Sequence, residues 1–232
     1  MIDFHSHILP GADHGCDSTA TAYRQLAMMH GAGTRAVVAT PHFYPHREKP
    51  ESFLARRGEA VARLLKKMPE GQPHPAVYVG AEVLVCAGMH EMEGLESLAI
   101  EGTDVILLEM PFTQWGEDLI ETVRAIPALG LVPVMAHIDR YPPNLVSRLF
   151  ARGGLLAQIN AEAFGGLGFP KDLRPYLDSS VVVALGSDLH GAEAKGYHPF
   201  LKMVKKLGGE AEGIFNLTAQ LLAEAKPILK ST

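Results

Sequence analysis

Short apolar runs alternate with longer segments of helical periodicity along the whole chain. The runs are rich in Val, Ile, Leu and Ala, and each ends in polar residues. They predict seven strands, at 2–5, 35–42, 76–82, 104–110, 131–137, 155–160 and 180–188. Continuous apolar strands of this kind are typical of a parallel sheet covered by helices.

The segments between the strands carry apolar residues at helical spacing. The first predicted helix begins after Asp17 or Ser18, either of which can cap it, and ends by Gly33. The second begins near Pro50, a residue favoured in the first helical turn. Its expected apolar face is Leu54, Val61, Leu64, Leu65 and Met68, and further helices are expected near 119–126, 144–152, 198–207 and 210–225.

Seven strand–helix units in 232 residues are too many for a small open sheet with a second domain. They predict an α/β fold in which the strands close into a (β/α)7 barrel. No linker, low-complexity stretch or further repeat interrupts the pattern. We therefore expect a single domain over residues 1–232.

Composition narrows the class of protein. The chain is 47% hydrophobic, enough for a substantial core, and its net charge of -5 argues against a nucleic-acid partner. Basic pairs such as Arg56-Arg57 are expected on solvated helix faces, and His74 and His90 in exposed polar loops. The two cysteines are expected to be reduced thiols. With no signal-peptide pattern and no membrane span, a cytoplasmic protein is expected.

Metal-ligating residue types stand at the ends of the predicted strands. In a (β/α) barrel the carboxyl ends of all strands meet at one mouth, where active sites lie. We therefore expect these side chains to converge although they are far apart in sequence. They are His5, His7, His42, Glu82, Glu109, His137, Asp188 and His190.

Imidazoles and carboxylates without thiolates suit Zn²⁺, Mn²⁺ or Fe²⁺. Eight such groups exceed the needs of one ion, so two or three divalent ions sharing bridging carboxylates are expected. Such a cluster lowers the pKa of bound water and stabilises attacking and leaving oxygens, which favours phosphoester hydrolysis. Taken singly, a strand-end histidine is more often a core residue than a ligand, and Glu109 could equally pair with an arginine.

The motifs MIDFHSHILPGADHG, VVATPHF, VGAEV, LLEMP, VMAHIDRY and ALGSDLH follow one another in the chain. In order and spacing they resemble the PHP (polymerase and histidinol phosphatase) superfamily. They are most similar to its CpsB/CapC/YwqE branch of manganese-dependent protein-tyrosine phosphatases, which act in bacterial capsular and exopolysaccharide production. The resemblance covers residues 1 to about 200 and implies a distorted, TIM-like (β/α)7 barrel with three metal ions.

The resemblance also implies roles for individual residues. Glu82 would bridge the first and second ions. The remaining implied ligands are His5, His7 and Asp188 for the first ion, Glu109 and His137 for the second, and His42 and His190 for the third.

Arg140 matches the arginine that this branch places beside the substrate phosphate, and a guanidinium fork suits phosphate oxygens. A structural ion pair, to Asp139 or to a neighbouring helix, is the alternative. The expected reaction is in-line attack of a metal-bound hydroxide on phosphorus. His42, or another histidine of the mouth, would protonate the leaving group.

The chain departs from the branch at two positions. The branch usually reads DDG where this chain has Asp13-His14-Gly15, so His14 stands where the second carboxylate would bind the third ion. Imidazole removes one negative charge and favours Zn²⁺ or Fe²⁺ over Mn²⁺. Lys195 stands where the branch commonly has an arginine, and an ammonium is a weaker clamp for phosphate.

The expected partner is a phosphotyrosyl protein, with a bacterial tyrosine kinase tail as one candidate, or a small phosphomonoester. A small-molecule phosphatase of the histidinol-phosphate type would use the same ligands. A non-catalytic metal-binding partner module and a PHP exonuclease are further alternatives. The acidic net charge disfavours the exonuclease. The sequence does not specify an oligomeric state.

Overall fold

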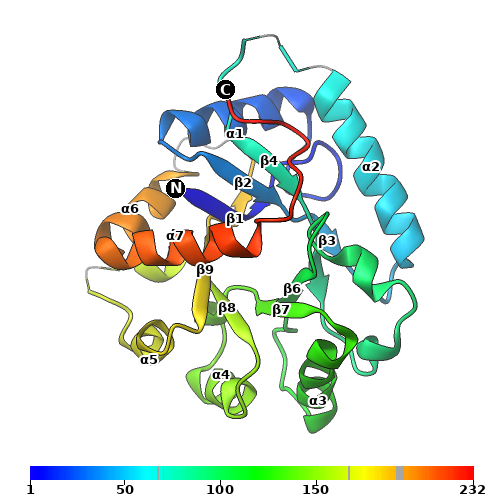
Figure 1. Ribbon diagram of the computed structural model, residues 1–232, viewed down its shortest axis with the longest axis vertical. Coiled ribbons are helices and arrows are strands. Elements are labelled where there is room, and N and C mark those ends of the chain that lie inside the picture. Colours follow the sequence, from blue (N-terminus) through cyan, green and yellow to red (C-terminus); the bar gives the residue numbers. More distant parts are fainter. Residues whose placement is uncertain (67, 70, 167, 192–195) are drawn as a thin grey trace.

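The computed structural model describes residues 1–66, 68–69, 71–166, 168–191 and 196–232. Its strands form a ring with helices around it (Figure 1). The strands are β1 (Ile2–His7), β2 (Ala36–Ala39), β3 (His42–Phe43), β4 (Ala76–Val79), β5 (Glu82–Leu84), β6 (Val105–Glu109), β7 (Val132–Met135), β8 (Leu156–Asn160), β9 (Val182–Gly186) and β10 (Leu189–His190). The α-helices are α1 (Thr19–Gly31), α2 (Pro50–Lys66), α3 (Glu117–Ala125), α4 (Pro143–Phe150), α5 (Arg174–Asp178), α6 (His198–Leu207) and α7 (Gly209–Leu221).

All the strand pairs are parallel, and they lie in two sheets of order β10-β1-β2-β4 and β3-β5-β6-β7-β8-β9. Because β3, β5 and β10 continue β2, β4 and β9 along the chain, the two sheets join into one ring of seven strand positions. A hydrogen bond of 2.8 Å from the amide of Asp188 to the carbonyl of His5 links the last position to the first. The expected parallel (β/α)7 barrel is confirmed, in a distorted form.

Three strands expected to be continuous, at 35–42, 76–82 and 180–188, are each broken near the carboxyl end. Pro41 lacks the amide that a ladder requires. Gly80 passes so close to Ile100 that an added Cβ would lie 2.9 Å from its Cγ1. Asp188 turns the chain with a φ of 51°. The apolar runs predicted the strands correctly but not these interruptions.

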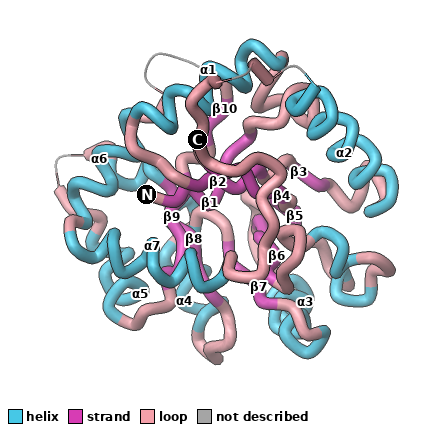
Figure 2. Tube along the Cα trace, turned by 45° about the horizontal axis from the view of Figure 1, so that its top comes forward, coloured by secondary structure: helices cyan, strands magenta, loops and turns pink. Residues whose placement is uncertain are grey.

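The helices cover the outside of the ring, and α7 crosses its amino-terminal end together with the C-terminal segment (Figures 1 and 2). There Leu229 forms an antiparallel bridge with Val77 of β4. The inner apolar cluster includes Phe4, Val38 and Leu107, and it fills the barrel below the mouth. Among the described residues, no helix is long and apolar enough to cross a membrane.

A register shift in the pairing of β1 with β2 lies between Asp3 and Ser6. A β-bulge changes the face that the following residues present. Phe4 therefore packs in the inner cluster. His5 and His7 also face the inside of the barrel, at its mouth, although a regular strand would point them to the face opposite that of Phe4.

Three details differ from expectation. Leu65 is 41% exposed, because the buried face of α2 includes Phe53 and Arg57 instead. Arg57 was expected in a solvated pair, but it is buried and donates to the carbonyl of Gly80 and the carboxylate of Glu101. His74, expected in an exposed polar loop, is also buried.

Candidate metal centre

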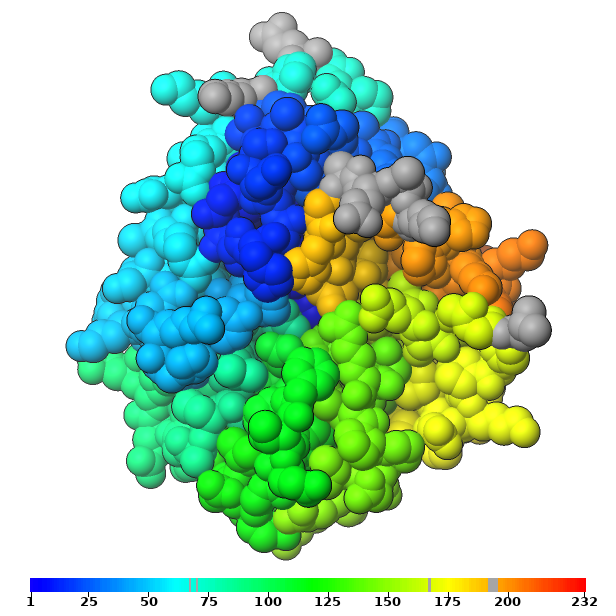
Figure 3. All heavy atoms as spheres, turned by 180° about the vertical axis from the view of Figure 1, so that it is seen from behind, coloured from blue at the N-terminus to red at the C-terminus, as the bar shows by residue number. Residues whose placement is uncertain are grey.

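The eight strand-end residues predicted as ligands do converge at one end of the barrel. Figure 3 looks onto this face, where dark-blue N-terminal atoms, green atoms and orange atoms surround a hollow. His5, His7, His42, Glu82, Glu109 and His137 are buried there, and Asp188 and His190 are half-buried. Their nitrogen and oxygen atoms form three overlapping groups that could each hold an ion.

The first group consists of His5, His7, Glu82 and Asp188, with one donor atom from each within 4.8 Å of all the others. Nε2 of His5 lies 3.2 Å from Oε2 of Glu82. Nε2 of His7 lies 3.1 Å from Oδ1 of Asp188. These are the ligands that the resemblance implied for the first ion, together with the bridging glutamate.

The second group consists of His42, Glu82 and Glu109. Nδ1 of His42 lies 2.9 Å from Oε2 of Glu82. His137 borders the same pair, with Nε2 at 2.9 Å from Oε1 of Glu82 and 3.6 Å from Oε1 of Glu109. Glu82 thus faces both groups, as a bridging carboxylate must.

The third group consists of His7, His42 and His190. His14 is exposed at its edge, and its ring lies 5.0 Å from that of His42 and 4.8 Å from that of His190. None of the three donor groups includes His14. Its role as a ligand therefore stays a prediction.

Two buried carboxylate oxygens, Oε2 of Glu82 and Oδ1 of Asp188, have no hydrogen-bond partner among the described residues. Each of these oxygens faces imidazole nitrogens, of His5 and His42 for Glu82 and of His7 for Asp188, and a cation held between them would neutralise the buried carboxylates. Burial also raises the pKa of Glu109 to about 7, an effect that the nearby charge of Glu82 reinforces. The donor set therefore fits divalent cations, which would let Glu109 ionise beside the charged Glu82.

Several positioning residues were not identified from the sequence. Oδ2 of Asp13 lies 2.7 Å from Nδ1 of His7. Oε1 of Gln158 accepts from the amide of His137 and lies 3.2 Å from Nδ1 of His5. Asn160 donates to Oδ2 of Asp188 over 3.1 Å. The available signal was the pair of amides, two residues apart, inside the apolar run LLAQIN.

Close backbone approaches also shape the site. A Cβ on Gly15 would lie 2.1 Å from the Cβ of His7, and one on Gly186 would lie 2.6 Å from the Cβ of His5. Positive φ angles occur at His137 (32°) and Asp188 (51°), both of them predicted ligands. Such strained conformations persist where the surrounding structure holds them, and they concentrate at functional sites.

Arg140 lies beside the donor cluster. One guanidinium nitrogen lies 2.6 Å from Oδ2 of Asp188, and another lies 3.0 Å from Oε2 of Glu162. Of the two structural ion pairs considered as alternatives, the one to Asp139 does not form, since Asp139 accepts from the amide of Asn160. The one to a neighbouring helix does form, because Glu162 lies in the 3-10 helix Ala161–Phe164. Lys195, the other predicted phosphate contact, lies outside the described residues.

The sequence of the chain matches a known protein family. Residues 1–211 match the family model described as "Capsular polysaccharide synthesis, CpsB/CapC". The chain belongs to the CpsB/CapC family. Its membership accounts for the order of the motifs from HSHILPG to ALGSDLH, which all lie within the matched residues.

The chain is similar to curated members of this family over almost its whole length. It is 25% identical to tyrosine-protein phosphatase YwqE of Bacillus subtilis, covering 99% of this chain and 94% of YwqE. It is 26% identical to tyrosine-protein phosphatase CpsB of Streptococcus agalactiae, covering 100% of this chain and 99% of CpsB.

A solved structure shows the same fold. It comes from a study of YwqE from Bacillus subtilis and CpsB from Streptococcus pneumoniae, described there as unique metal-dependent tyrosine phosphatases. The TM-score is 0.75 at 22% identity, over 100% of this chain and 99% of the other. The barrel is therefore that of the CpsB/CapC family.

Proposed function

We propose that this CpsB/CapC family member is a metal-dependent phosphomonoester hydrolase that removes phosphate from phosphotyrosyl protein. The observation that carries the proposal is the set of donor groups that share Glu82, with Arg140 bound to Asp188 at their edge. The names of the relatives, tyrosine-protein phosphatases YwqE and CpsB, support the substrate class.

Two or three divalent ions, of Mn, Fe or Zn, would be held by the donor groups. Bound there, they would lower the pKa of a water molecule and offset the charge of the phosphate. Glu82 is proposed as the bridge between ions. The other proposed ligands are His5, His7 and Asp188 for one ion, Glu109 with the neighbouring His137 for a second, and His42 and His190 with the adjacent His14 for a third.

Arg140 is proposed to orient the phosphate. Its side chain is 28% exposed at the mouth, so it reaches solvent while Asp188 and Glu162 fix its plane. A fixed guanidinium can donate two parallel hydrogen bonds to phosphate oxygens. His42 or a neighbouring histidine of the mouth would hold the proton for the leaving oxygen, and Lys195 is a further proposed phosphate contact.

The biological setting is proposed from the family. Its description links it to capsular polysaccharide synthesis, so regulation of such a polysaccharide system is the proposed role, with a tyrosine kinase tail as the candidate substrate. A cytoplasmic location, expected from the sequence, is part of the same proposal.

The test combines elemental analysis with activity assays. Purified protein is stripped of metal and assayed on a phosphotyrosyl peptide and on histidinol phosphate after Mn²⁺, Fe²⁺ or Zn²⁺ is added back. We expect turnover of the peptide that is lost in Glu82→Gln. Glu59→Gln, a change of the same type at an exposed helical position, is the matched control. Metal-replete wild-type protein without turnover on any phosphomonoester would overturn the proposal.

A further inference from the structure

A second hollow, of about 420 Å³, opens beside Arg140, and none of the proposed metal ligands lines it. Its lining combines aromatic and aliphatic surfaces with this single cation and the polar side chains of Thr113 and Gln114. It is lined by Phe112, Trp115, Tyr141, Pro142 and Leu145 together with Arg140. Arg140 also bonds Asp188 and lines, with Asp188 and His190, the neighbouring hollow over the donor groups, so this one residue borders both hollows.

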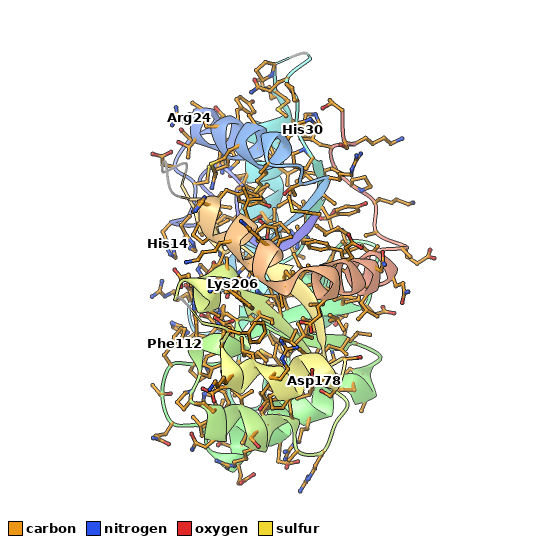
Figure 4. The ribbon with its side chains drawn as sticks, turned by 90° about the vertical axis from the view of Figure 1, so that its left-hand side faces the viewer. His14, Arg24, His30, Phe112, Asp178 and Lys206 are labelled. Atoms are coloured by element: carbon orange, nitrogen blue, oxygen red, sulfur yellow. The ribbon has the colours of Figure 1, made fainter. Side chains whose placement is uncertain are left out.

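Phe112 is unusual because it leaves an aromatic ring in water. It is 64% exposed, although its ring lies 6.0 Å from that of His137 at an interplanar angle of 14° and 5.5 Å from that of Tyr141. Figure 4 shows Phe112 on the same edge of the molecule as His14, which marks the barrel mouth. Exposed aromatic surface next to a polar site is typical of a ligand contact.

The segment that carries Phe112 is held at both ends. The amide of Met110 donates to the hydroxyl of Tyr141 over 2.9 Å. Nε1 of Trp115 donates to the carbonyl of Pro111 over 2.8 Å, and Arg148 donates to the carbonyl of Trp115. The ring of Phe112 is thus presented to solvent from a fixed backbone.

We propose that this hollow is an aryl subsite, in which the phenyl ring of a phosphotyrosyl side chain packs on Phe112 while its phosphate lies at Arg140. The aryl subsite rests on the proposed phosphatase function, and it makes Phe112 the residue that selects aryl phosphates as substrates of the protein. Aromatic rings gain from contact with other rings in offset or edge geometries. An alkyl phosphate has no ring for this surface, whereas an aryl phosphate places its ring and its charge on complementary groups.

A binding experiment tests the subsite without relying on turnover. Metal-loaded protein is titrated with phenylphosphonate and, in parallel, with methylphosphonate. Trp115, the only tryptophan of the chain, lines the hollow and reports occupancy through its fluorescence, with calorimetry as the second readout. We expect phenylphosphonate to bind about tenfold more tightly in the wild type, which is the effect of one aromatic contact.

Phe112→Ala should reduce the phenyl-to-methyl affinity ratio to about one, and Phe112→Leu should retain part of it. Leu129→Ala is the matched control, because Leu129 is 52% exposed and precedes β7, at the opposite end of the barrel from the mouth. It should keep the wild-type ratio. In the same variants, kcat/KM for a phosphotyrosyl peptide relative to glycerol phosphate should fall about tenfold only in Phe112→Ala.

Failure of the subsite and failure of the proposed function have different signatures. Peptide hydrolysis with unchanged ratios in Phe112→Ala overturns the subsite and leaves the phosphatase. A phenyl-to-methyl affinity ratio near one in wild-type protein also overturns the subsite. So does a Phe112→Ala variant that changes its oligomeric state while its affinity ratio and its kcat/KM ratio stay at the wild-type values. A phenylphosphonate preference that depends on Phe112, in a protein that hydrolyses no phosphomonoester, supports the subsite and overturns the phosphatase.

Discussion

Oδ2 of Asp13 lies 2.7 Å from Nδ1 of His7. The same carboxylate accepts the amides of Gly15 and His42, so it ties the N-terminal loop to two predicted ligands. Burial alone would raise the pKa of Asp13, but the hydrogen bond and charge of His7 hold it well below its usual range. Asp13 is therefore ionised at neutral pH, and it leaves Nε2 of His7 as the nitrogen that faces the donor groups.

Replacing Asp13 with alanine should weaken metal binding about tenfold to a hundredfold, as loss of a carboxylate behind a histidine ligand typically does. The affinity is measured by competition with a chelating dye. Asp178→Ala, which removes an exposed carboxylate well away from His14 (Figure 4), serves as the control. Equal affinities in the two variants would show that Asp13 does not support His7.

Gln158→Leu should lower the free energy of unfolding of the metal-free protein by about 2–4 kcal/mol. The substitution leaves the amide of His137 and Nδ1 of His5 buried without an acceptor. Gln25→Leu is a matched control, since Gln25 is equally buried but neither of its side-chain amide atoms has a described hydrogen-bond partner. Chemical denaturation should find Gln25→Leu at least as stable as wild type; similar losses in both variants would contradict the prediction.

Arg140→Lys should lower kcat/KM for a phosphotyrosyl peptide about a hundredfold, because an ammonium cannot reproduce the two-pronged contact of a guanidinium. Arg174→Lys provides the comparison. Arg174 also joins two carboxylates, Asp178 and Glu210, but it does not line the mouth. Steady-state kinetics on both variants distinguish a phosphate contact from a structural one, and a wild-type rate in Arg140→Lys would exclude the phosphate role.

His14→Ala should lower both activity and metal content. The ring of His14 stacks with that of His42 at an interplanar angle of 8°, close to the third donor group. His14→Asp should instead shift the preferred ion from Zn²⁺ or Fe²⁺ towards Mn²⁺, because carboxylates are harder ligands than imidazole. Elemental analysis and activity with each ion give the result. Wild-type rates and metal content in His14→Ala would remove it from the ligand set.

Metal affinity should rise with pH up to about pH 9. Burial alone would lower the pKa of His5, but the charges of Glu82 and Asp188 raise it to about 9. Because the pKa of His5 is higher in the folded protein than in the unfolded chain, its protonated form stabilises the metal-free fold. This stabilisation is fully present below about pH 6.5 and is lost as the pH rises through 9. An ion must displace this proton, so binding near pH 7 releases protons. Calorimetry in two buffers of different ionisation enthalpy measures the release; identical heats would refute it.

The hydrophobic pattern predicted the parallel barrel, and with it the convergence of the ligands. This was possible because a parallel ring places every strand end at one mouth, so residues as distant as His5 and His190 need only lie at strand ends to meet. Those strand-end positions can be identified from the local sequence, because each apolar run ends in polar residues. The family motifs then added the roles that side-chain type alone leaves open.

Tertiary structure decided what depends on register and on contacts between distant segments. The bulge in β1 that turns His5 inward is set by its pairing with β2, and the break at Gly80 by the close approach of Ile100. Gln158 meets His5 across 153 positions of sequence. Phe112 looked like an ordinary apolar residue after a strand, and only the packing around it shows that its ring stays exposed. The pattern of hydrophobic residues along the sequence specifies which face of each strand or helix is apolar. Which residues contact that face is decided only when the strands close into the barrel.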